Sequence, residues 1–170
     1  MTSTYTTVPE VKGYLFDTLL PAAVATLAST ITVGTTTVAL RPPDVFYGRI
    51  AGATAPDSYI IIGPTSGGDA TAPASFPSTA TRWQTEDYAV QLLIWYRVGD
   101  TSNEAQRIAT ESGYTVYRAI AAQVAASRNL GGVIPAGGHC QFTQITDNDF
   151  DMAEGRGIGL VCNLHVTGRI

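Results

Sequence analysis

The sequence predicts an α+β fold, a mostly antiparallel sheet with a long amphipathic helix packed on one face and a further helix near the N-terminus. Residues 86–98 (EDYAVQLLIWYRV) alternate between two faces as a strand does, and residues 101–128 have the apolar spacing of one long helix. Residues 140–147 and 156–170 have the pattern of two paired strands. We expect these three strands to share one sheet, on which the helix packs.

The composition favours a folded chain with a nearly neutral surface. Hydrophobic residues make up 45% of the 170 residues and charged residues only 14%, whereas about 25% is typical of soluble domains. The formal net charge is −4, so no positive field attracts nucleic acid or anionic lipid. We expect one domain over residues 1–170 that contains a long low-complexity loop.

Neither a signal peptide nor a membrane span is expected. The first ten residues, MTSTYTTVPE, have no basic region and no apolar region. The longest nearly apolar run, residues 19–28, is shorter than the ~20 residues that a membrane helix needs.

The two cysteines, Cys140 and Cys162, fall in predicted strands. A turn near residues 152–154 would place Cys162 beside Phe142 and Cys140 beside Leu164. A disulfide is one interpretation, and two buried free thiols in a reducing cytoplasm are the favoured one.

The N-terminal third predicts a helix followed by short strands. Thr7 is expected to cap the helix, and the apolar spacing of residues 8–19 continues it until Pro21 kinks or ends it. Residues 22–29 could resume this helix. Strand signals follow in residues 36–41, in residues 45–50 after the Pro42-Pro43 break, and in residues 58–62.

Residues 63–81 (GPTSGGDATAPASFPSTAT) form the low-complexity loop, in which Phe76 is the only large apolar residue. Loops of this length are uncommon in compact domains and are usually functional or disordered. The alternatives are a linker and a projecting segment that orders against a partner, and the second is favoured.

In the C-terminal half, the alternation of residues 86–98 separates a core face (Tyr88, Val90, Leu92, Ile94, Tyr96, Val98) from a face that is only half polar (Asp87, Ala89, Gln91, Leu93, Trp95, Arg97). We expect the second face to be covered too.

The sequence also predicts how the helix over residues 101–128 begins and ends. Thr101 and Glu104 predict a capping box at its start, and Gly131 or Gly132 predicts a left-handed cap at its end. Several residues of its predicted buried stripe are small, and the stripe consists of Ala105, Ile108, Ala109, Ser112, Val116, Ala119, Ile120 and Val124.

No motif in the chain indicates catalysis or a cofactor. His139 and His165 lack the partners of a zinc site, and the acidic run DNDFDMAE (Asp147, Asp149, Asp151, Glu154) lacks the glycine and terminal glutamate of a calcium loop. The acidic run is expected to be a solvated turn, with a weak cation site as the minor alternative.

The glycine-rich run GRGIGL precedes a strand, so no helix N-terminus follows it to bind phosphate. It predicts a bulge or a close backbone approach. The order of residues suggests no serine, histidine and aspartate triad. Trp83, Tyr88, Trp95 and Tyr96 are expected to pack in the sheet, because the basic residues of a nucleic-acid platform do not alternate with them. We therefore expect no enzyme, no cofactor and no metal.

The order of these segments resembles the tail terminator proteins of long-tailed bacteriophages. The resemblance rests on the helix VPEVKGYLFDTL, the strand EDYAVQLLIWYRVGD, the helix beginning NEAQRIATESGYTVYR with its Leu-Gly-Gly stop, and the closing strand GIGLVCNLHVTGRI. The short Arg169-Ile170 tail matches the family's arginine–hydrophobic ending.

This resemblance implies a structural virion protein, made in the host cytoplasm, that forms a homohexameric ring. The ring would cap the tail tube protein and join it to the head–tail connector or stopper, while DNA passes through the lumen without specific binding. No membrane is involved. A head-closure or connector subunit and a tail tube protein are the alternatives, and a small monomeric enzyme or ligand-binding α+β domain is the more remote one. The candidate assembly contacts are Pro42, Pro43, Gly67, Gly68 and Phe76.

Overall fold

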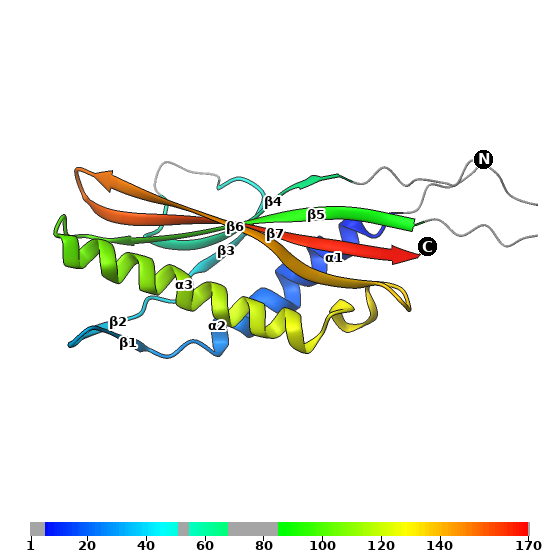
Figure 1. The fold of residues 1–170 in the computed structure, drawn as a ribbon, viewed down its shortest axis with the longest axis horizontal. Helices are drawn as coiled ribbons and strands as arrows, with labels where there is room; N and C mark the ends of the chain where they lie inside the picture. The colour runs from blue at the N-terminus through cyan, green and yellow to red at the C-terminus, as the bar shows by residue number, and fades with distance from the viewer. Residues whose placement is uncertain (1–5, 51–54, 68–84, 170) are drawn as a thin grey trace, which may run out of the picture.

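The computed structural model describes residues 6–50, 55–67 and 85–169, and it confirms the α+β fold (Figure 1). A five-stranded sheet forms one layer, and the helices lie on one of its faces. The helical elements are α1 (Val8–Tyr14), a π-helical turn (Leu15–Leu19), α2 (Leu20–Ala25), α3 (Asn103–Ala126) and a 3₁₀ turn (Leu130–Gly132). The strands are β1 (Thr30–Val33), β2 (Thr36–Ala39), β3 (Asp44–Tyr47), β4 (Ser58–Ser66), β5 (Thr85–Val98), β6 (His139–Met152) and β7 (Gly155–Arg169).

The large sheet has the strand order β3-β4-β5-β7-β6. The three strands predicted from the C-terminal half share it, and β5 pairs with β7 along almost the full length of both. All neighbouring strands are antiparallel except β3 and β4, which are parallel. Strands β3 and β6 are therefore the two edges of the sheet.

The β6–β7 hairpin is longer than the sequence predicted. Strand β6 continues to Met152, which pairs with Gly155, so that only residues 153–154 form the turn. The acidic run consequently lies mostly in a strand, and the expectation of a solvated acidic turn is wrong.

The predicted neighbours of the two cysteines are also wrong. With the turn at residues 153–154, Cys162 lies opposite Ile145, and a shift of register between Phe142 and Gln144 then places Cys140 opposite Val166. Both cysteines are fully buried free thiols. Such a shift is a β-bulge, and it leaves no mark in the sequence as clear as the alternation of apolar and polar residues along a strand.

Helix α3 packs on β5, β6 and β7 through a stripe that contains several small residues, as predicted. Its buried members are Ala105, Ala109, Ser112, Gly113, Val116, Ile120 and Val124. A Cβ atom added at Gly113 would lie only 2.8 Å from Ile158 Cγ2 of β7. The glycine therefore lets the helix approach the sheet closely.

The ends of α3 differ from the prediction. Ser102, and not Thr101, is the N-cap, and its Oγ accepts the backbone N–H of Ala105 at 3.1 Å. The helix stops at Ala126, and Leu130–Gly132 then forms a separate 3₁₀ turn. The serine is held in its capping position because it also donates its own N–H to Asp100 at 3.1 Å.

The N-terminal helix passes Pro21 instead of ending there. A π-helical turn precedes the proline, and the N–H of Leu20 donates to the carbonyl of Leu15, five residues back. Pro21 then occupies the first turn of α2, where its missing N–H is tolerated. The helix continues to Ala25.

The sequence does not predict strand β1: residues 22–29 could resume the helix, and the first strand signal comes in residues 36–41. It forms a small separate hairpin with β2, and Gly34 in the connecting turn has a φ of +61°. Each strand has only four residues, too few for a clear alternation.

Candidate functional site

None of the described helices lies on one face of the five-stranded sheet, which is called here the open face (Figure 1). The odd-numbered residues of β5 point to this open face, while Tyr88, Val90, Leu92, Ile94 and Tyr96 are buried under the helices. Leu93, Trp95 and Arg97 are half-buried, since no described element packs over them. The expectation that this face is covered is not met by the part of the chain that the structure describes.

Four aromatic side chains, called here the aromatic row, cross the open face from one edge of the sheet to the other. Phe46 of β3 contacts Tyr59 of β4 edge to face, with ring centroids 6.3 Å apart. Tyr59 stacks on Trp95 of β5 at 6.1 Å. Trp95 meets Phe150 of β6 at 4.8 Å.

Two glycines of β7, Gly157 and Gly159, make the last of these contacts possible, because β7 lies between β5 and β6. Gly159 pairs with Trp95 and Gly157 pairs with Phe150. A Cβ at Gly159 would lie 3.1 Å from the Phe150 ring, and one at Gly157 would lie 3.3 Å from the Trp95 ring. The rings therefore meet above strand β7. The close backbone approach predicted for GRGIGL is found at Gly155, where an added Cβ atom would lie 2.0 Å from the carbonyl oxygen of Val98.

A hollow of about 440 Å³ lies beside the aromatic row. It is lined by Ala55, Pro56, Tyr59, Trp95, Arg97, Met152 and Glu154. Its lining combines the rings of Tyr59 and Trp95 with the charged side chains of Arg97 and Glu154, which are called here the charged rim. Such a surface suits an apolar or aromatic side chain carried on a polar segment.

The charged rim is a connected set of ion pairs. Arg97 donates Nε to Asp57 Oδ1 at 2.8 Å and a terminal nitrogen to Glu154 Oε2 at 2.9 Å. Arg97 and Arg41 each donate a further bond to Asp57. Hydrogen bonding from Arg97 holds the pKa of Asp57 below its ordinary value. These ion pairs hold the Arg97 guanidinium beside the aromatic row, and the carboxylates of Asp57 and Glu154 compensate its positive charge.

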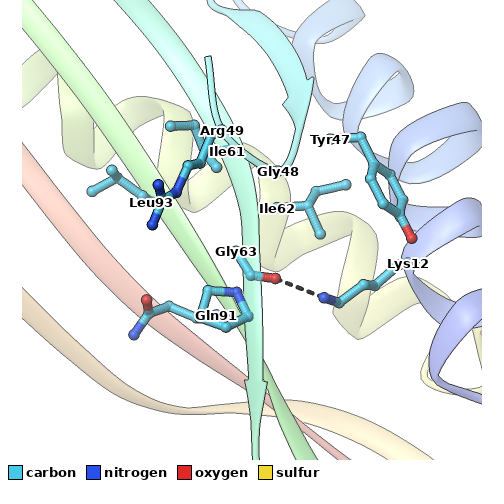
Figure 2. Close-up of a pocket in the computed structure, with 10 residues that line it drawn as sticks. Lys12, Tyr47, Gly48, Arg49, Ile61, Ile62, Gly63, Gln91 and Leu93 are labelled. Carbon is cyan, nitrogen blue, oxygen red and sulfur yellow. Dashed lines mark hydrogen bonds between the residues drawn. The ribbon is translucent and has the colours of Figure 1, made fainter. Parts of the chain in front are cut away.

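A second hollow of about 410 Å³ lies where α1 meets β3 and β4 (Figure 2). Lys12, the only lysine in the chain, donates Nζ to the carbonyl of Gly63 at 2.8 Å, and Figure 2 shows this bond spanning from α1 to β4. The pairing of β4 with β5 shifts register between Ile62 and Thr65. Lys12 therefore bonds to β4 at the place where the pairing of β4 with β5 is irregular, and this gives the lysine a structural role.

The acidic residues of β6 do not form a cation site within the described residues. Their partners come from other elements: Tyr114 donates to Asp147 at 3.0 Å, Gln106 donates to Asp149 at 2.7 Å, and Arg156 pairs with Asp151 at 2.9 Å. No group of three or more histidine, cysteine or acidic side chains in that part of the chain is placed to hold a metal ion.

The histidines make ordinary cross-strand contacts. His165 Nε2 lies 2.6 Å from Asp87 Oδ1, and His139 Nδ1 lies 3.2 Å from the hydroxyl of Thr167. No described helix is long and apolar enough to cross a membrane.

The candidate contacts named from the sequence are only partly described. Pro42 and Gly67 are exposed, and Gly67 has a φ of +76°, but Pro43 is buried. Gly68 and Phe76 lie outside the described residues. None of the described three is a member of the aromatic row, and these contacts stay predictions.

Sequence reasoning did not find the aromatic row. It grouped Trp83, Tyr88, Trp95 and Tyr96 as sheet packing, but Tyr88 and Tyr96 are buried beneath the helices and Trp83 lies outside the described residues. The alternation of residues 86–98 does indicate that Trp95 lies on the opposite face of the strand from Tyr88 and Tyr96. Its partners Tyr59 and Phe150 come from other strands, which local periodicity does not align.

Comparisons with known proteins assign no family. No protein-family model matches the chain, and no curated protein matches it. Among solved structures, the chain is similar to one described as "Virion of native gene transfer agent (GTA) particle", with a TM-score of 0.46 and 13% sequence identity. The similarity covers 97% of this chain and 100% of that chain. It is a weak similarity of fold.

Proposed function

We propose that the chain is a structural virion protein that assembles with copies of itself into a ring, a homohexamer that caps a phage tail tube and joins it to the head–tail connector. The observation that carries the proposal is the open face of the sheet. Monomeric proteins rarely expose a large contiguous apolar patch, and such patches mark interaction sites. Leu93, Trp95 and Phe150 lie on a face that no described helix covers, and they fit a subunit that is completed by its neighbours.

The free edges of the sheet support the same proposal. β6 is a long edge strand, and its residues from Thr143 to Asp151 are exposed. Unpaired edge strands are templates for contact with another chain unless they are blocked. The segment resemblance to tail terminators and the low charge of the chain add to this support.

The test is the mass of the assembled protein. Native mass spectrometry and negative-stain microscopy over a wide concentration range should show a closed ring with six times the 17.9 kDa subunit mass. A protein that stays monomeric at every concentration would contradict the proposal and favour the remote alternative of a monomeric enzyme or ligand-binding domain.

The position in the particle separates the structural alternatives. Gold-labelled antibody against the chain should mark the upper end of the tail in particles made from the genome that encodes it. Labelling inside the head–tail connector would favour a head-closure or connector subunit. Labelling along the whole tail would favour a tube protein.

A further inference from the structure

Three large apolar side chains are exposed among the described residues, and all three lie on the edge strands of the five-stranded sheet. Tyr47 of β3 is 52% exposed, and Ile145 and Phe150 of β6 are 36% and 40% exposed. No described strand pairs with the outer side of β3 or of β6. Exposed apolar side chains at unpaired strand edges indicate that another chain covers both edges.

The outer edge of β6 is negatively charged. Asp147, Asp149 and Asp151 lie in this strand, and no arginine or lysine accompanies them there. Asp151 pairs with Arg156, but the hydrogen bonds that Asp147 and Asp149 accept come from neutral side chains of α3, a tyrosine and a glutamine. The charges of Asp147 and Asp149 are therefore not compensated by a basic side chain in the described part of the subunit.

The opposite edge of the sheet carries the second hollow, of about 410 Å³, and this hollow is positively charged. It lies where β3 ends at Tyr47 while β4 continues to Ser66. Lys12 and Arg49 are the charged residues among those described that line it. Lys12 bonds to a backbone carbonyl, and Arg49 forms no ion pair with a described residue. The acidic residue of β3, Asp44, lies three residues before Tyr47, about 10 Å away along the strand.

The complementary groups of the two edges lie on the same face of the sheet. Ile145 and Asp147 pair with residues of β7 that are buried beneath α3, so both point to the face that carries the helices. Tyr47 points to this face as well, because its ring contacts Phe16 of the π-helical turn, with centroids 5.9 Å apart. Figure 2 shows Tyr47 and Lys12 on the same side of β4. When one sheet follows the next around a ring, the helices stay on one side and these groups face one another.

The two edges that meet belong to different copies of the chain. Within one subunit, β6 and β3 are the outermost strands of the order β3-β4-β5-β7-β6, about 19 Å apart at ~4.8 Å per strand. Contact of β6 with a second β6 would bring like charges together, which is unfavourable. Contact of β6 with the second hollow of another copy joins opposite charges instead.

We infer that the outer edge of β6 in one subunit binds the second hollow of the next copy. Ile145 of the first subunit packs on Tyr47 of the next. Asp147 of the first subunit pairs with Lys12 of the next, whose ammonium has three donors and uses one of them on the carbonyl of Gly63. This junction is head-to-tail, so its repetition produces a ring. The inference rests on the ring-forming function proposed above and names the residues at its junction.

Cysteine trapping tests the junction in the full chain. The native cysteines, Cys140 and Cys162, are fully buried, so cysteines introduced at the edges are the reactive ones. Ile145→Cys and Tyr47→Cys are prepared separately. Oxidised glutathione joins cysteines that reach disulfide geometry, and a short bismaleimide joins close cysteines that do not. A mixture of the two variants should give a covalent heterodimer, and neither variant alone should give a dimer.

The variant that carries both substitutions should give a ladder of covalent oligomers that ends at six subunits. The two cysteines of one chain lie on opposite edges of its sheet, so a link within one chain is not expected. Ala122→Cys is the matched control, because Ala122 is exposed on α3 and belongs to neither edge. Its mixture with Tyr47→Cys should give no dimer.

A charge substitution tests the same junction without a crosslink. Ile145→Lys should move ring formation to at least about tenfold higher concentration, because the new ammonium would face Lys12 and Arg49. Ala122→Lys adds the same charge on α3 and should leave ring formation unchanged. Far-ultraviolet circular dichroism checks that both variants are folded. Rings of folded Ile145→Lys at the wild-type concentration would overturn the inference.

Native mass, measured on the same samples, separates this inference from the proposed function. If the wild-type protein forms a ring and the double cysteine variant stays unlinked, the junction is wrong and the ring-forming function stands. Covalent dimers of Ile145→Cys alone would show that β6 meets β6 and would also overturn the junction. A monomer at every concentration overturns both.

Discussion

The carboxylate of Glu86 accepts the backbone N–H of Thr7 with both of its oxygens, each at 3.0 Å, although 79 residues separate them in sequence. The Thr7 hydroxyl also bonds to Glu86 and lies 2.9 Å from the Tyr88 hydroxyl. Glu86 and Thr7 are only 5% and 3% exposed. A carboxylate of β5 thus binds the free N–H at the start of α1, where the helix dipole favours negative charge.

Glu86→Ala should lower the free energy of unfolding by about 2 kcal/mol, because a buried N–H and a hydroxyl lose a charged acceptor. Glu111→Ala is the control, since Glu111 is exposed and lies 3.8 Å from Arg118; its cost should stay within about 0.5 kcal/mol. Urea denaturation of both variants checks this. Equal effects would mean that the Glu86–Thr7 contact contributes nothing specific.

Gly113 of α3 and Gly13 of α1 should respond to alanine in opposite directions. Gly113→Ala places a methyl group 2.8 Å from Ile158, and overpacking of this kind costs about 1–3 kcal/mol. Nothing lies within 4 Å of a Cβ at Gly13, so Gly13→Ala should stabilise by about 0.5–1 kcal/mol through helix propensity. The melting temperatures of the two variants test this prediction. A stabilised Gly113→Ala variant would show that α3 does not approach β7 closely.

Ile120→Asp should prevent folding, because Ile120 is fully buried between α3 and the sheet and a charge there has no partner. Ile120→Val should cost only about 1 kcal/mol. Circular dichroism and melting temperature distinguish the two. An unchanged melting temperature for the aspartate variant would place Ile120 outside the core.

Stability should decrease at alkaline pH. Burial raises the pKa of Cys140 to about 11 and that of Cys162 to about 12, and it raises the pKa of Tyr88 to about 12. Above the ordinary thiol pKa the unfolded chain loses protons that the folded chain retains, so the thiols' contribution is complete below about pH 9 and is lost above it.

The measurement is the free energy of unfolding from pH 7 to pH 11. The slope above pH 9 should become shallower in Cys140→Ala and again in a double variant with Cys162→Ala. Both thiols of the folded wild-type protein should resist iodoacetamide at pH 8, because burial keeps them neutral. Rapid alkylation of the folded protein would show that the two strands open readily.

Deletion of residues 67–78 should leave the fold intact but prevent attachment to tails or connectors, because this loop is proposed to contact neighbours. Far-ultraviolet circular dichroism checks the fold, and complementation of a particle-producing strain that lacks the gene checks attachment. If the deletion variant gave infectious particles at normal yield, the loop would be only a linker, and the proposed contacts of this loop with its neighbours would be wrong.

The candidate site could be predicted only in part. The alternation of residues 86–98 placed Trp95 on the half-polar face, and that position is where the structure has it. The register that brings Tyr59 and Phe150 to Trp95 depends on pairing across four strands, and the glycines of β7 acquire their role only in that register.

The sequence by itself determined the elements whose pattern is long and regular: the α+β class, strands β5 and β7, and the small-residue stripe of α3. Local periodicity was sufficient there, because each residue's face follows from its own segment. Tertiary structure alone decided the π-helical turn before Pro21, the short β1–β2 hairpin, the register shift at Thr143 and the Glu86–Thr7 contact. These features depend on which distant segments meet, and the free energy of packing and of buried hydrogen bonds selects them over local preference.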